Sequence, residues 1–466
     1  MTQAAVDCII DNGYVVTMNP RREIFARGAV AVDGGRIRGV GRSEDIARDF
    51  RAERRVDAAG GVVHPGFIDT HVHLMNAARG AFPDTMEIGV SFLINKKWWN
   101  NVTDEDEYAS ALLCGLEMLG NGTTCFLEAG TVHAPEVAAE AVDRLGLRAY
   151  LGDPFLWDVP VASGGDEGAR APRGLRRSLD LLGGQLRRNR DRNALVQGCV
   201  VVFGLGSATD ELALAAKRVA DEHGVVYTQH QSFAPSDAGA DQQRFGRRAL
   251  LHQQEIGLLG HNCTFSHMND LEPDEVDCVV ASGMSVAWCP SAAMTIATGA
   301  TIHGSHLEML RRGVNTSLGS DGPNSSCRYD LNLQGLLTVV SAREKKKLRA
   351  AMSLEDVLEM ATINGARAIG AQDVLGSLEV GKHADLVVRR TDMPEAQPGV
   401  DPLQHMLYSC GSRSVSQVFV AGNLVWRDGR STRMEDQEIF GLAREAAGRM
   451  WKKLGLKAEP RWPVVA

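Results

Sequence analysis

Several apolar segments of this chain end in histidine or aspartate, residue types that bind metal ions. The clearest case is His71-Val72-His73, which ends the apolar run that begins at Gly66. Successive side chains of a β-strand point to opposite faces, so residues two apart point the same way. Two imidazoles on one side of a strand end have a spacing that suits a divalent metal. The motif therefore predicts a metal site at the end of a strand.

Three further apolar segments end in ligand-type residues, and they lie far along the chain. They are Val225–Thr228 before His230, Cys263–Ser266 before His267, and Val314–Ser320 before Asp321. Each residue taken alone is more often an ordinary core or surface residue than a ligand. Together, five such side chains at strand ends favour a metal site over that simpler interpretation.

The middle of the chain alternates short apolar segments with helical ones. About eight such units over residues 63–375 predict a (β/α)8 barrel, in which the C-terminal strand ends meet on one face and carry the chemistry. This arrangement would bring the distant ligand-type residues together. We expect helices over residues 104–119 with Thr103 as N-cap, and over 135–145, 174–190, 241–258, 306–312 and 353–368.

The sequence patterns at both ends of the chain predict short strands joined by turns. Asp11-Asn12-Gly13 and Asp33-Gly34-Gly35 are hairpin signals, and strands recur after residue 376. The predicted fold class is α/β: a TIM-like barrel (63–375), a small β-sandwich domain built from 1–62 plus 376–430, and a C-terminal helix and tail (431–466).

The amino-acid composition and net charge of the chain limit the kinds of partner it is expected to bind. The chain has 466 residues, 44% hydrophobic and 23% charged, with a net charge of −8 and no basic block. These values argue against nucleic acid or a membrane as the main partner. Nine cysteines without paired spacing predict reduced thiols and a cytoplasmic protein. We expect a small-molecule substrate and a homo-oligomer.

These motifs, taken as a set over nearly the whole chain, resemble the amidohydrolase superfamily. The resemblance is greatest to its cytosine-deaminase, chlorotriazine-hydrolase and phenylurea- or molinate-hydrolase group. The segments that carry it are Pro65–His73, Ser266-His267, Trp288–Ser291, Leu318–Gly322, Ala361–Ala366 and Gly376–Val387.

The resemblance implies a set of roles. His71, His73, His230 and Asp321 would hold one divalent metal, with His267 beside it to polarise the substrate. Zinc is favoured, with iron, cobalt or manganese as alternatives. Binuclear branches of the superfamily carry a carboxylated lysine at the end of a barrel strand before the histidine equivalent to His230. In this chain Val200–Phe203 occupies that strand and no lysine stands at its end, so a mononuclear site is expected.

The same resemblance implies a hydrolytic mechanism. The metal would activate a water molecule. Asp321 would take its proton and deliver it to the leaving nitrogen, and His267 would donate a hydrogen bond where negative charge develops.

One residue departs from the pattern of the deaminases in this group. They carry a glutamate three residues after the histidine equivalent to His230, and it protonates a ring nitrogen. This chain has Phe233 there. Phe233 cannot transfer a proton and would make that wall of the site apolar, together with Phe92 and Trp98 of a predicted lid.

Three functions follow as expectations. The first is hydrolysis of a C–N bond in a small apolar urea, carbamate, thiocarbamate or amide, with a phenylurea-like substrate favoured. The alternative is an aminohydrolase or dechlorinase acting on an N-heterocycle such as a triazine, purine or pyrimidine. A third, different in class, is a metal-free scaffold. His303 and His306 are open as substrate contacts, and His64 is expected to be structural. Glu128 ends the next strand on the site side of the barrel, and whether it does more there than brace loops is left open.

Overall fold

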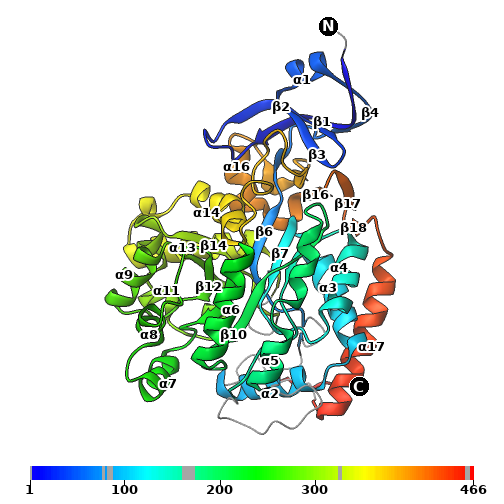
Figure 1. Cartoon of the computed structure of the whole chain (residues 1–466). Helices are drawn as coiled ribbons and strands as arrows, with labels where there is room; N and C mark the ends of the chain where they lie inside the picture. Colours follow the sequence, from blue (N-terminus) through cyan, green and yellow to red (C-terminus); the bar gives the residue numbers. More distant parts are fainter. Residues whose placement is uncertain are drawn as a thin grey trace.

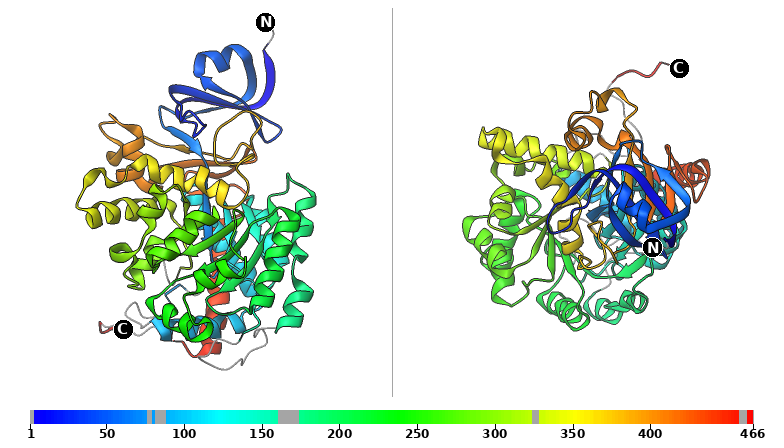
Figure 2. Two further views of the ribbon diagram at one scale, coloured as in Figure 1. Left: turned by 60° about the vertical axis from the view of Figure 1, so that its left-hand side comes forward. Right: turned by 90° about the horizontal axis from the view of Figure 1, so that it is seen from above.

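The fold was analysed in a computed structural model of the chain, shown in Figure 1. The structure describes residues 3–75, 79–80, 88–159, 174–323, 328–456 and 462–465, without the side chains of residues 88–93 and 96. A sheet domain that contains the N-terminus stands on one end of a barrel, and α17 runs along the barrel's side (Figure 1). The left view of Figure 2 shows the same projecting sheet from another side.

The barrel is built from parallel strands in two hydrogen-bonded groups, β6–β9 and β10–β14. Only Cys199 separates β9 from β10, and its N–H donates to Leu151 O (3.1 Å), so the two groups continue one another. The other seam closes where Val72 pairs with Asp321, whose N–H donates to His71 O at 2.8 Å. β9 and β10 together make one barrel strand, so the nine segments form eight strands and the expected (β/α)8 barrel is confirmed. Its strands are β6 (Phe67–Val72), β7 (Thr123–Glu128), β8 (Arg148–Leu151), β9 (Val196–Gly198), β10 (Val200–Gly204), β11 (Tyr227–Gln231), β12 (Cys263–His267), β13 (Ser285–Trp288) and β14 (Asn315–Leu318).

The helices around the barrel agree with the sequence where a cap defines them. Thr103 and Asp106 form a capping box at the start of α3, as expected. Three expected helices are each divided in two, at Gly183 (φ 80°), at Gly246 (φ 70°) and at Thr362 (φ −125°, ψ −90°). A left-handed glycine ends a helix, which explains the first two breaks. The helices before residue 250 are α1 (Ser43–Asp49), α2 (Ile88–Asn101), α3 (Asp104–Gly120), α4 (Pro135–Leu145), α5 (Leu175–Leu181), α6 (Asp210–His223), α7 (Pro235–Phe245) and α8 (Ala249–Glu255). The later ones are α9 (Pro273–Ser282), α10 (Pro290–Thr295), α11 (Ala300–His303), α12 (His306–Arg311), α13 (Leu331–Lys346), α14 (Leu354–Ala361), α15 (Ile363–Ala368), α16 (Pro402–Gln404) and α17 (Asp436–Leu454).

Strands from both chain ends share one nine-stranded sheet, in the order β18-β17-β16-β15-β5-β1-β2-β3 with β4 paired to β1. The sheet curls back on itself, because Ala384 N before β15 donates to Gly35 O in the β2–β3 turn (2.9 Å), and Arg54 Nη2 on β4 donates to Gly422 O in the β16–β17 turn (3.0 Å). The domain boundaries given above stay a prediction. The strands are β1 (Ala4–Val16), β2 (Ile24–Asp33), β3 (Arg36–Arg42), β4 (Phe50–Asp57), β5 (Val62–Pro65), β15 (Leu386–Arg389), β16 (Val415–Val420), β17 (Asn423–Arg427) and β18 (Arg430–Ser431).

Two buried arginines join the sheet domain to the barrel. Arg148 Nε and Nη2 donate to the two carboxylate oxygens of Asp385 at 2.7 and 3.2 Å, and both side chains are 5% exposed. Arg389 Nε donates to His64 Nε2 (2.9 Å), and its two Nη atoms donate to Gly411 O and Asn332 Oδ1. His64 is thus a structural residue, as expected.

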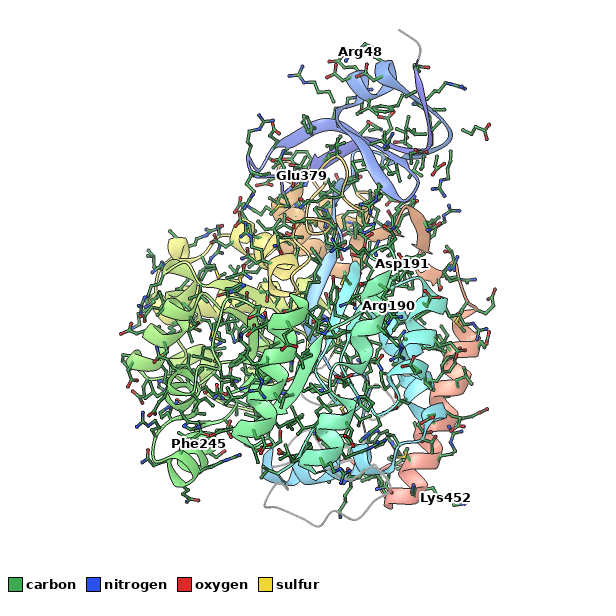
Figure 3. All side chains as sticks on the ribbon, in the orientation of Figure 1. Arg48, Arg190, Asp191, Phe245, Glu379 and Lys452 are labelled. Atoms are coloured by element: carbon green, nitrogen blue, oxygen red, sulfur yellow. The ribbon has the colours of Figure 1, made fainter. Side chains whose placement is uncertain are left out.

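Charged side chains lie at the far ends of the molecule. Figure 3 shows Arg48 on α1 at one end and Lys452 on α17 at the other, both exposed. In the described part of the chain, every helix is too short or too polar to cross a bilayer. The cytoplasmic location and the homo-oligomer stay predictions.

Candidate metal site

Four side chains predicted from the sequence as ligands converge at the C-terminal ends of the barrel strands. His73 Nε2 lies 3.0 Å from His230 Nε2 and 3.3 Å from Asp321 Oδ1, and His71 Nε2 lies 3.9 Å from the same oxygen. All four side chains are buried. The barrel therefore brings residues up to 250 positions apart into one small space.

Hydrogen bonds on the far side of two rings fix which nitrogen carries a proton. His230 Nδ1 lies 2.7 Å from Phe203 O, and a carbonyl only accepts, so Nδ1 is the N–H and Nε2 has the lone pair. His73 Nδ1 lies 2.9 Å from Thr131 Oγ1, which leaves Nε2 of that ring facing the site. His71 Nε2 is buried without a hydrogen-bond partner among the described residues.

This arrangement fits a metal ion on physical grounds. Lone pairs of two imidazoles and a carboxylate oxygen face one another at hydrogen-bonding distance, with no proton between the two rings, and like partial charges repel at such distances. A cation in their midst converts the repulsion into attraction. Three neutral imidazoles with one carboxylate suit a single divalent metal such as zinc.

Burial also shifts the ionisation of these groups toward their neutral forms. It holds the pKa of His71 and His73 well below the ordinary value, and neighbouring imidazoles lower it further. Burial lowers the pKa of His230 to about 4 and raises the pKa of Asp321 to about 7. Near neutral pH the histidines are therefore uncharged, which is the form that binds metal.

The backbone is strained where these side chains leave the strands. Asp321 and His267 have φ values of 65° and 73°, in the left-handed region that non-glycine residues rarely adopt. Gly319 passes so close to its neighbours that a Cβ there would lie 2.7 Å from His71 Cβ and 2.8 Å from Cys289 Sγ. Such strain persists where the fold over-determines it and is common at functional sites.

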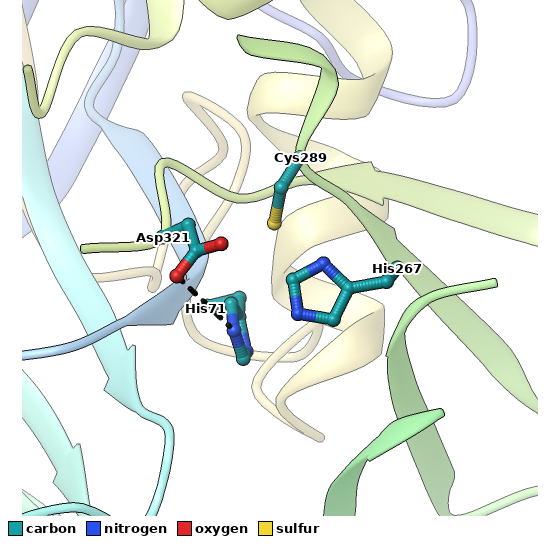
Figure 4. Close-up of side chains that lie close together, drawn as sticks. All are labelled: His71, His267, Cys289 and Asp321. Atoms are coloured by element: carbon teal, nitrogen blue, oxygen red, sulfur yellow. Dashed lines mark ion pairs between the residues drawn. The ribbon is translucent and has the colours of Figure 1, made fainter. Parts of the chain in front are cut away.

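His267 lies beside both His71 and His230, with ring centres 4.8 and 5.3 Å apart. Figure 4 shows His267, Cys289 and Asp321 around His71, and ligand-type atoms of these four residues lie within 4.8 Å of one another. Sequence reasoning missed Cys289, because nothing in Cys289-Pro290 indicates that its thiol faces the site. Burial raises the pKa of this thiol, which keeps it protonated in the metal-free protein.

His306 supports His267 from behind. Its Nε2 lies 2.6 Å from His267 O, and its ring stacks on Trp288 with ring centres 4.3 Å apart. His306 therefore holds the strand end in place, whereas His303 is exposed at the end of α11.

The residues predicted to contact substrate lie in different surroundings. The Phe233 ring stands edge-on to His267 with centres 4.6 Å apart, beside the predicted site. Trp98 is 1% exposed within an apolar cluster, and its neighbour Trp99 is the one whose ring faces His73, at 6.3 Å. The Phe92 side chain lies outside the described residues. All three substrate contacts stay predictions.

Aromatic rings border the other side of the candidate site. Phe203 lies 4.5 Å from His230 between ring centres, and Trp157 stacks on Phe203 at 5.3 Å with the planes 4° apart. Sequence reasoning did not single out Phe203 or Trp157. Their apolar surroundings exclude water from the ligands and strengthen electrostatic interactions there.

Comparison with known proteins agrees with this geometry. The chain matches the Amidohydrolase family over residues 62–425. It is 31% identical to a 5-methylthioadenosine/S-adenosylhomocysteine deaminase of Syntrophobacter fumaroxidans, over 96% of this chain and 99% of that protein. It is 28% identical to a 5'-deoxyadenosine deaminase of Methanosarcina mazei, over 95% of this chain and 98% of the relative.

Solved structures show the same fold. An adenosine deaminase from Xanthomonas campestris with bound zinc superposes with a TM-score of 0.89 at 25% identity, over 97% of this chain and all of that one. The zinc complex of atrazine chlorohydrolase from Arthrobacter aurescens TC1 gives 0.82 at 20% identity, over 94% of this chain and all of the other. This chain therefore belongs to the amidohydrolase family and is a metal-dependent hydrolase that acts on carbon–nitrogen bonds.

Proposed function

We propose that the protein is an aminohydrolase that removes an amino group from a small nitrogen heterocycle by hydrolysis. The observation that carries the proposal is the buried convergence of His71, His73, His230 and Asp321, with His267 beside them. Relatives that align over almost their whole length act on adenosine-type nucleosides, which supports a heterocyclic substrate over the phenylurea-like one expected first.

The proposal assigns a role to each of these side chains. His71, His73, His230 and Asp321 would hold the metal, which supplies an activated water molecule when bound. The Asp321 carboxyl would take a proton and pass it to the leaving nitrogen. His267 would hydrogen-bond the atom on which negative charge develops.

The surroundings of Phe233 favour a second candidate. Its ring packs against His267 where the deaminases of this group carry an acid. The nearest carboxylate along the chain, Asp237, accepts hydrogen bonds from Phe233 N and Ala234 N at 2.8 and 2.9 Å, so it caps α7. A carbonyl substrate such as a urea or carbamate needs no ring protonation, because the metal and His267 would polarise its C=O bond directly.

A screen of the zinc-loaded protein separates the two candidates. Ammonia release would be followed with adenosine-type nucleosides, pyrimidines and aminotriazines, and amine release with phenylureas, carbamates and thiocarbamates. Turnover of a heterocycle by wild type, lost in H71A, is the expected result. Turnover of the ureas or carbamates alone would overturn the proposal in favour of the second candidate.

The F233E variant tests the same point from the other side. A glutamate at this position would supply the missing acid, so heterocycle turnover should rise while any urea hydrolysis stays the same. F233L is the matched control, because it changes the ring without adding an acid. A metal-free scaffold is disfavoured by the facing lone pairs, and zinc binding that H71A does not weaken would revive it.

A further inference from the structure

A chain of hydrogen bonds leads away from His73 on the side opposite to the other proposed ligands. His73 Nδ1 lies 2.9 Å from Thr131 Oγ1, and that hydroxyl donates to Glu128 Oε1 at 2.8 Å. We propose that Thr131 and Glu128 are positioning residues, which fix the ring and the tautomer of His73 so that its Nε2 lone pair faces the metal. The inference rests on the proposed ligand role of His73.

The Glu128 carboxylate is held rigidly by the turn that follows β7. Oε2 accepts from Gly130 N (2.8 Å) and Oε1 from Thr131 N (2.9 Å). The turn needs glycine at position 130, because φ is 83° and a Cβ would lie 2.5 Å from Val201 Cγ1. Both Glu128 and Thr131 are buried, at 2% and 6% exposure, so water does not compete for these hydrogen bonds.

The direction of each hydrogen bond follows from counting protons. In its ionised form the Glu128 carboxylate only accepts, so it takes the one hydrogen of the Thr131 hydroxyl. The hydroxyl oxygen can then act only as acceptor toward His73, so the ring must carry its proton on Nδ1. Nε2 is left with its lone pair, aimed at His230 and Asp321.

His230 also needs its proton on Nδ1, but a different kind of acceptor holds it there. There the backbone carbonyl of Phe203 accepts from Nδ1 at 2.7 Å. A carbonyl cannot be removed by substitution, whereas the hydroxyl and carboxylate behind His73 can. Partners of this kind orient a ligand and raise its basicity, and their loss costs about 10- to 100-fold in metal affinity.

Zinc affinity of the metal-free protein, measured in competition with a chromogenic chelator, tests the inference. T131V keeps the shape of the side chain and removes the hydroxyl, so zinc should bind about 10- to 100-fold more weakly. T131S restores the hydroxyl and should bind close to wild type. E128Q replaces one acceptor oxygen by a donor against the turn's N–H groups and should also weaken binding.

A matched control separates the relay from a general effect of losing a buried hydroxyl. Thr264 is 1% exposed, and its hydroxyl donates to Ala368 O at 2.6 Å, away from the proposed ligands. T264V should lower the unfolding temperature without changing zinc affinity. If T131V does not fold, E128Q decides the question alone.

The outcomes distinguish this inference from the proposal beneath it. Zinc binding that H73A leaves intact would remove His73 from the ligand set. Zinc binding that H73A weakens, but that T131V and E128Q leave at the wild-type level, would overturn the positioning role alone. T131S binding as weakly as T131V would also overturn it, because side-chain shape rather than the hydroxyl would then set the affinity.

Discussion

Two buried polar centres of this molecule differ in how their hydrogen-bond donors and acceptors are paired. Where the barrel meets the sheet domain, Arg148 donates to the carboxylate of Asp385 and Arg389 donates to the neutral acceptors His64 Nε2, Gly411 O and Asn332 Oδ1, so donors face acceptors. At the other end, the lone pairs of His73, His230 and Asp321 face one another. The first centre adds stability. The second is stable only through the surrounding fold, which is the expected property of a site that waits for a cation.

The largest effect should come from removing one proposed ligand. H230A should bind zinc more than about 100-fold more weakly, beyond the range for outer partners, and should lose turnover. The substitution also removes one of the facing lone pairs. The unfolding temperature of metal-free H230A should therefore fall by less than that of a variant that breaks the Arg148–Asp385 pair. Chelator competition and thermal unfolding of the same samples check both parts.

The arginine centre should respond in the reverse way. D385A leaves the buried Arg148 without its partner, which costs about 3–5 kcal/mol of unfolding free energy. Zinc affinity should stay at the wild-type level, since Asp385 lies at the other end of the barrel. Urea unfolding with and without zinc measures this, and a D385A protein with normal stability would contradict the comparison.

A pH-dependent effect separates the two centres further. Burial raises the pKa of Asp321 to about 7 from the ordinary 3.8, so the folded metal-free protein holds an extra proton between these values. The corresponding stability is present at low pH and is lost as the pH rises through about 7, by at most about 4 kcal/mol. The D321N variant has an uncharged amide at this position at every pH, so it lacks this pH-dependent loss of stability.

Metal-free D321N should therefore unfold at a higher temperature than wild type at pH 8, and the difference should vanish toward pH 4. With zinc bound the order should reverse, because wild type then gains a ligand. Unfolding temperatures at both pH values, with zinc and with a chelator, test the sign. A variant that is less stable than wild type at pH 8 without metal would contradict the buried, unmatched carboxylate.

An ordinary hydrogen bond gives the baseline for these effects. T103A removes the cap of α3, whose hydroxyl accepts from Asp106 N at 3.3 Å, and should cost about 1 kcal/mol. Zinc affinity should not change. Denaturant unfolding would show whether the larger values above exceed the loss of one cap.

Much of the fold was accessible from sequence because local chemistry dictates it. Thr103 begins α3 where its capping box predicts, and Pro135 begins α4. Breaks inside expected helices were missed at Gly183, Gly246 and Thr362, because a single interior residue says little about the turn that tertiary packing imposes.

Some residues of the candidate site could be predicted from the sequence and others could not. Residues at strand ends, such as His230, could be predicted because the barrel directs all those ends to one face. Cys289, Phe203 and Thr131 were missed because their roles depend on neighbours from other strands, which the sequence does not place. Trp99 rather than Trp98 faces His73, a one-residue difference that only the register of α2 decides.

The barrel seam has a consequence for the order of folding. His71 lies on the first barrel strand and Asp321 just after the last one; Val72 pairs with Asp321, and Asp321 N donates to His71 O at 2.8 Å. During synthesis more than two-thirds of the chain must be made before this pair can meet. The complete set of four proposed ligands therefore exists only after the last barrel strand has been made, whereas His71, His73 and His230 are present earlier.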